Sequence, residues 1–86
     1  MASIDFADAT VDRMERGVAR AIANGSYQST ERYDLGDGRE LRVTAVRQPD
    51  KIIMTWSLWI DGGYSDTTRT AAAAKIARHA AHAGVA

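Results

Sequence analysis

The apolar residues near the start of the chain recur every three or four positions, with charged residues between them. This spacing makes a single apolar stripe, so it predicts an amphipathic helix over residues 5–24. Aspartates crowd the first turns and arginines the last, which suits the helix dipole. Asn24-Gly25 favours the left-handed backbone that ends a helix. The stripe consists of Val11, Met14, Val18, Ala21 and Ile22.

The middle of the chain alternates between apolar and polar residues, which is the pattern of β-strands. Leu35 and Leu41 flank Gly36-Asp37-Gly38, and they share a face only if the loop between them has an odd number of residues. We therefore expect a hairpin with a three-residue loop and Gly38 in the left-handed conformation. Residues 48–51 predict the next turn, because their proline lacks the N–H that a strand needs.

Residues 51–61 form the clearest strand pattern and carry large apolar side chains on both faces. We expect Trp56 to face the core, and Asp61-Gly62-Gly63 to end the strand. The face of Trp56 also holds Ile52, Met54, Leu58 and Ile60, whereas the opposite face holds Ile53, Thr55, Ser57 and Trp59.

An alanine-rich helix follows, which Ser65 or Asp66 is expected to cap and which runs to about Ala83. Small side chains in its core stripe would let it lie close to a sheet. The predicted fold is therefore α+β, with one domain over residues 1–86 in the order helix, three antiparallel strands, helix. Both helices are expected to cover one face of the sheet, making two layers. The core stripe of the second helix is Ala73, Ile76, Ala77 and Ala80.

Composition narrows the function classes. The chain has 86 residues, 26% of them charged, with a formal net charge of zero and no cysteine. This composition is that of a folded domain rather than a disordered one, and it allows neither a disulfide nor a thiolate ligand. The first residues lack the pattern of a secretion signal, and no apolar run approaches the roughly 18 residues of a membrane span. We expect a cytoplasmic protein that does not enter membranes.

Catalytic groups that converge are scarce. His79 and His82 lie three residues apart on the second predicted helix, but no acidic residue follows Asp66 to complete a metal site. Ser57 has no patterned base beside it, and Ser65 is better explained as a helix cap. We expect no metal, no cofactor and no enzymatic activity.

The outer face of the sheet is the candidate binding surface. If the helices cover the face of Trp56, then Trp59 and Ile53 point outward beside Arg42 and Val46 of the neighbouring strand. Aromatic and arginine side chains among small polar ones are typical of protein-interface hot spots. Three other interpretations stay open: strand ends or a loop cover Trp59, Trp59 is one of the scattered apolar residues that all protein surfaces carry, or this face closes a homodimer.

The second helix carries a secondary basic patch of Arg69, Lys75 and Arg78. Such a patch would suit phosphate or an acidic protein. The alternative function is therefore nucleic-acid binding through this helix, with an affinity that falls steeply as salt is added.

Two resemblances bear on these hypotheses. The helix–three strands–helix order is similar to that of the double-stranded RNA-binding domain, although Ser65 is followed here by Asp66 and Thr67 rather than by that family's paired lysines. The strand 52–60, its turn and the alanine-rich helix resemble small phage and mobile-element proteins of the anti-CRISPR type. The second resemblance implies an inhibitor that occupies the surface of a host defence complex, with a host nucleoprotein complex as partner.

Overall fold

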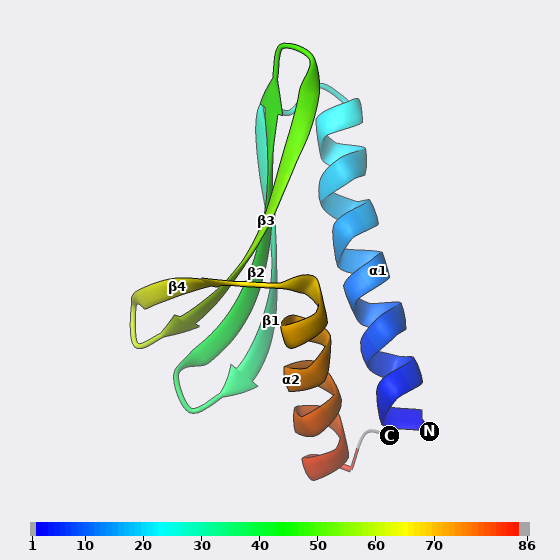
Figure 1. Ribbon diagram of the computed structural model, residues 1–86, viewed down its shortest axis with the longest axis vertical. Coiled ribbons are helices and arrows are strands. Elements are labelled where there is room, and N and C mark those ends of the chain that lie inside the picture. Colours follow the sequence, from blue (N-terminus) through cyan, green and yellow to red (C-terminus); the bar gives the residue numbers. More distant parts are fainter. Residues whose placement is uncertain (1, 85–86) are drawn as a thin grey trace.

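The computed structural model describes residues 2–84, and within them two helices lie against a four-stranded antiparallel sheet. This confirms the α+β class, and both helices cover the same face of the sheet (Figure 1). The first helix begins three residues earlier than predicted. The helices are α1 (Ala2–Ala23) and α2 (Arg69–His82), and the strands are β1 (Gln28–Gly36), β2 (Arg39–Gln48), β3 (Lys51–Ile60) and β4 (Gly63–Thr67).

The fourth strand corrects the prediction of three. Asp61 and Gly62 both have positive φ angles, of 50° and 89°, and they form a two-residue turn that folds β4 back onto β3. Ser65 and Asp66 therefore lie in a strand and do not cap the helix. The cap is Thr68, whose hydroxyl accepts a hydrogen bond of 3.0 Å from the backbone N–H of Ala71.

The first hairpin also differs from the predicted three-residue loop. Its turn has two residues, Asp37 and Gly38, and both have positive φ angles. The odd residue is supplied instead by a bulge, because Gly36 pairs with Arg39 while Asp34 pairs with Glu40, so that the residue between them has no partner. The bulge has the effect expected of the loop: Leu35 and Leu41 are both buried.

The core lies between the sheet and the two helices. The apolar stripe of α1 packs on β1 and β2, and Ile76 of α2 fills the space beside it. Trp56 is 4% exposed, and its indole N–H donates a hydrogen bond of 2.9 Å to the Glu15 carboxylate on α1. The fully buried side chains also include Val11, Met14, Val18, Leu41, Val43, Ala72 and Ala80.

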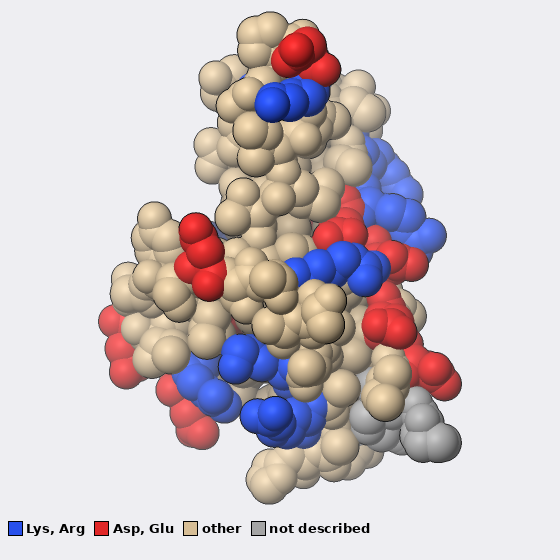
Figure 2. Space-filling model, in the orientation of Figure 1, with Lys and Arg blue, Asp and Glu red and all other residues tan. Residues whose placement is uncertain are grey.

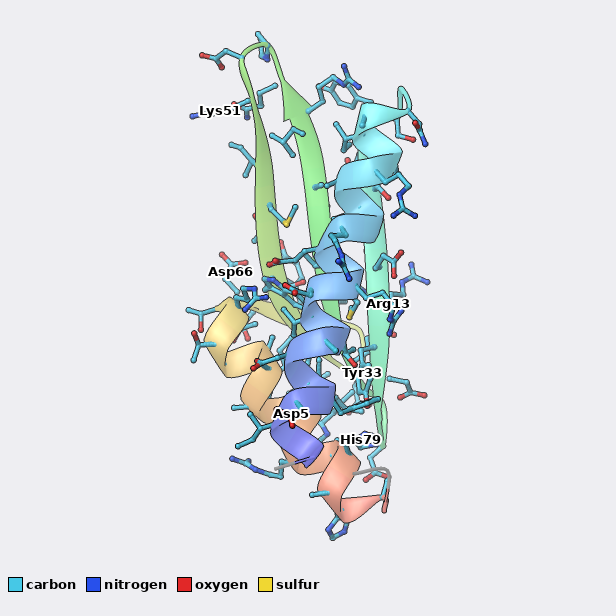
Figure 3. The ribbon with its side chains drawn as sticks, turned by 90° about the vertical axis from the view of Figure 1, so that its right-hand side faces the viewer. Asp5, Arg13, Tyr33, Lys51, Asp66 and His79 are labelled. Carbon is cyan, nitrogen blue, oxygen red and sulfur yellow. The ribbon has the colours of Figure 1, made fainter. Side chains whose placement is uncertain are left out.

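The helices differ in length, and this leaves the sheet unequally covered. The first has 22 residues and follows most of the height of the sheet, whereas the second has 14 and covers only the lower part in Figure 1. The upper part of β3, which includes the labelled Lys51 in Figure 3, therefore extends past α2.

Candidate functional site

The outer face of the sheet bears an aromatic cluster at its lower end. The Trp59 ring lies between Arg42 of β2, whose guanidinium carbon is 3.7 Å from the ring centroid, and Tyr64 of β4, whose ring stacks on it at 4.7 Å and 21°. The indole N–H of Trp59 donates a hydrogen bond of 2.9 Å to the hydroxyl of Ser57. Arg42 also pairs with Glu40. Both faces of the Trp59 ring are thus occupied within the chain, and Tyr64 presents the more exposed ring.

Ile53 and Val46 lie on the same outer face but at the other end. They are direct partners in the pairing of β2 with β3, and the pair Thr44–Thr55 separates them from Arg42. The four residues predicted to bind a partner therefore share one face, as two groups rather than as one patch. Tyr64 joins the lower group through β4, which the sequence pattern did not reveal.

The upper half of β3 has a free edge. Strand β4 pairs only with residues 56–60 of β3, and within residues 2–84 no strand pairs with residues 51–55 on that side. In an antiparallel ladder, alternate residues direct their N–H and C=O groups to the same neighbour. Trp56 and Ile60 pair with β4, so Ile52 and Met54 direct four backbone groups toward the empty side.

The side chains around this edge are apolar and exposed. The exposed fraction is 46% for Ile52, 37% for Ile53 and 36% for Met54. Ile52 and Met54 lie on the face that carries the helices, but α2 does not reach them, and Ile53 lies on the outer face. On the face seen in Figure 2, the upper part of the β2–β3 hairpin shows charged side chains at its tip and uncharged ones directly below. Natural edge strands usually carry charges, prolines or a covering segment that prevents pairing with other chains.

A hollow lies between α2 and the first hairpin. It has a volume of about 490 Å³ and combines residues of the helix with Arg39 at the start of β2. The Lys and Arg side chains there form a cluster in the lower part of Figure 2. Its lining consists of Leu35, Gly36, Asp37, Arg39, Lys75, Arg78, His79, His82 and Ala83.

Arg69, which was predicted to share a basic patch with Lys75 and Arg78, does not belong to this hollow. Its guanidinium pairs with Asp12 at 2.7 Å and with Glu15 at 3.1 Å, which ties the start of α2 to the middle of α1. The hydrogen bond to Glu15 is the main cause of the raised pKa of Arg69. The predicted basic patch is therefore split between a structural ion pair and an open hollow.

One of the two histidines, His79, contacts the side chain of Tyr33 on β1. The Tyr33 hydroxyl lies 3.4 Å from Nδ1 of His79, and the two rings meet edge to face at 5.8 Å (Figure 3). Burial raises the pKa of the Tyr33 phenol. In residues 2–84, no three His, Asp or Glu side chains gather closely enough to hold a metal ion.

Comparisons with family models, curated proteins and solved structures found no match to the chain. Neither α1 nor α2 combines the length and apolar character that a bilayer crossing requires.

Proposed function

We propose that this chain is a protein-binding module whose binding surface is the uncovered part of the sheet around β3. The observation that carries the proposal is the segment Ile52–Met54, where apolar side chains are exposed on both faces of a strand that also has a free edge. Fully burying an exposed apolar side chain of this size contributes about 1.5–3 kcal/mol. Ile52, Ile53 and Met54 are still 36–46% exposed, so a covering partner would gain part of that amount from each.

The expected mode of binding is strand addition. A partner segment in extended conformation would accept and donate hydrogen bonds at Ile52 and Met54, while its own side chains would pack beside those residues and beside Ile53. Because both faces of the site are apolar, the matching segment has consecutive apolar residues rather than an alternation of apolar and polar ones. The free edge spans residues 51–55, so the added strand is short.

The geometry disfavours a second copy of the chain as the occupant. Antiparallel pairing about a two-fold axis satisfies all four backbone groups only if Ile53 lies opposite Ile53 of the other copy. That register sets Asp50 of one copy opposite Trp56 of the other, where Thr67 already occupies the neighbouring position. Asp50 belongs to the turn between β2 and β3. An extended segment of a different protein has no turn at this position and avoids the overlap.

The finer proposal is that capture of this segment inhibits the partner by occupying its surface, as in a phage or mobile-element inhibitor of a host defence complex. The composition of the outer face supports it. The outer face adds the exposed ring of Tyr64 and the apolar pair Ile53 and Val46 to the free edge, so that one partner could cover both. The protein would then need no chemistry of its own, only an interface.

The first experiment tests the free edge itself. Hydrogen exchange followed by NMR should find the backbone amides of Ile52 and Met54 exchanging much faster than those of Trp56 and Leu58, because only the latter pair with β4. If the protection of the Ile52 and Met54 amides against exchange rises with the concentration of the purified protein, then this edge pairs between copies. A second copy would then replace the proposed partner.

The second experiment tests binding. Tagged wild-type protein and three variants are used to capture proteins from lysate, and each captured protein is quantified. Ile53→Lys places a charge on the surface, and Met54→Pro removes an N–H from the edge. Ile4→Lys is the matched control, because Ile4 is 60% exposed on α1, far from the edge. A partner lost with the first two variants and retained with the control supports the proposal, whereas equal capture by all four proteins contradicts it.

A further inference from the structure

The hollow beside α2 collects basic side chains from two separate parts of the chain. Lys75, Arg78, His79 and His82 have the spacing i, i+3, i+4 and i+7, so they form one stripe along the helix. Arg39 comes from the start of β2 and faces this stripe across the hollow. Two arginines, one lysine and two histidines thus line one cavity.

Little acidic charge balances them. Asp37 is the one acidic residue in the lining. Within residues 2–84, the ion pairs of the protein engage Arg32, Arg42 and Arg69, and none engages Arg39, Lys75 or Arg78. The hollow is therefore a region of positive potential in a chain whose formal net charge is zero.

The helix dipole explains only part of this arrangement. Basic residues near the end of a helix are stabilised by its partial negative charge, which accounts for His79 and His82 without a ligand. It does not account for Arg39, which belongs to the sheet. The hydroxyl of Tyr33 engages Nδ1 of His79 from behind, which leaves Nε2 of that ring as the nitrogen available to a ligand.

We propose that this hollow binds the phosphate groups of a small phosphorylated molecule of nucleotide size. Arginine presents a planar fork of donors that matches phosphate oxygens, and lysine adds a point charge. The volume of about 490 Å³ lies within the roughly 300–1,000 Å³ range of small-molecule sites. Arg39, Lys75 and Arg78 contact the phosphates, and Asp37 at the rim accepts hydrogen bonds from hydroxyl or amino groups of the same ligand. This site is separate from the free edge of β3, so it goes beyond the proposed protein binding.

The proposal is tested by calorimetric titration of the purified protein at low salt with pyrophosphate, ATP, adenosine and a short RNA duplex. Pyrophosphate and ATP should bind, and adenosine, which has no phosphate, should not. Tighter binding of ATP than of pyrophosphate identifies a nucleotide-like ligand, while equal binding shows that the phosphate groups alone are recognised. In NMR spectra, ATP should shift the backbone signals of residues 75–82 and of Arg39, and leave those of residues 51–55 unchanged.

Variants that each remove one positive charge distinguish binding in the hollow from general electrostatic attraction of phosphate to the protein. Arg39→Gln and Lys75→Gln should each weaken the binding of ATP about tenfold, since each removes a charged hydrogen bond. Arg20→Gln removes the same charge from an exposed position on α1 and should leave the affinity unchanged. Two results would overturn the proposal: no binding of either phosphate probe at low salt, or equal weakening by Arg20→Gln. Binding of the RNA duplex without binding of ATP and pyrophosphate would also overturn it, in favour of a nucleic-acid surface.

Discussion

The two halves of β3 have the same type of sequence and different environments, although Ile60 at the end of the lower half is also exposed, at 49%. In the lower half, residues 56–60 pair with β2 on one side and β4 on the other, and Trp56 is 4% exposed. In the upper half, residues 51–55 pair with β2 alone, and Ile52 is 46% exposed although it lies on the same face as Trp56. Alternation along a strand decides which face a side chain is on. Whether that face is covered depends on β4 and α2, which come from elsewhere in the chain.

The largest loss of stability should follow from removing the Trp56 side chain, which faces the helices from the lower half of β3. Trp56→Ala deletes a buried indole and leaves Glu15 without its N–H partner, so the free energy of unfolding should fall by about 3–5 kcal/mol. Small domains are stable by only about 5–15 kcal/mol, so this variant is expected to be largely unfolded under mild denaturant. Urea titration followed by circular dichroism measures the change. A loss below about 1 kcal/mol would contradict the assignment of Trp56 to the core.

Trp59→Ala should have an intermediate effect. The ring is lined by Arg42 and Tyr64 on the outer face, and the loss of one cation–π contact and one aromatic stack costs about 1–2 kcal/mol. The variant should stay folded in water, which the same urea titration can establish. Complete unfolding would show instead that Trp59 belongs to the core, and the outer face would then lose its main candidate contact.

Ile52→Ala should have a small effect on the isolated protein. Its side chain is about half exposed, and surface substitutions of this kind usually change stability by about 0.5 kcal/mol or less. Comparing it with Trp56→Ala isolates the contribution of coverage, because both residues lie on the same face of one strand. A loss comparable to that of Trp56→Ala would mean that the upper half is covered in solution.

The smallest effect concerns pH and should be absent near neutrality. Burial raises the pKa of Tyr33 above its ordinary value of 10.0, so the folded state favours the neutral phenol. Stability from this source is complete below the unfolded-state pKa and is lost as pH rises through the higher folded-state pKa. Thermal unfolding measured from neutral pH to about pH 11 should show a decline that Tyr33→Phe reduces. Tyr27→Phe, at a tyrosine that is 71% exposed, is the control and should leave the decline unchanged.

Sequence patterns predicted the elements whose burial follows from their own residues. The apolar stripe of α1 and the alternation of β2 and β3 repeat regularly over long segments, and the structure confirms these elements. Strand β4 was missed because its five residues include no apolar side chain besides Tyr64, and because Ser65 has the character of a helix cap. Asp61-Gly62 was the signal available, since this dipeptide favours the two-residue hairpin turn that the structure contains.

The candidate sites were less predictable because they depend on contacts between distant segments. The free edge of β3 exists because β4 ends at Thr67, and the residues of β3 themselves do not indicate where β4 ends. Part of the basic hollow could have been found from helical spacing. Arg69 lies about 180° around the helix from Arg78, whereas Lys75 and His82 lie on the same side of the helix as Arg78. The contribution of Arg39 requires knowledge of how the hairpin packs against α2.

The antiparallel arrangement of the two helices has a practical consequence for any assay. The start of α1 and the end of α2 lie at the same end of the molecule, and the turn between β2 and β3 lies at the opposite end (Figure 1). A tag or surface linkage placed beyond either helix would hold the protein with its apolar strand pointing away from the support. The hollow beside α2 would then lie close to the point of attachment, so phosphate ligands are better studied with the protein free in solution.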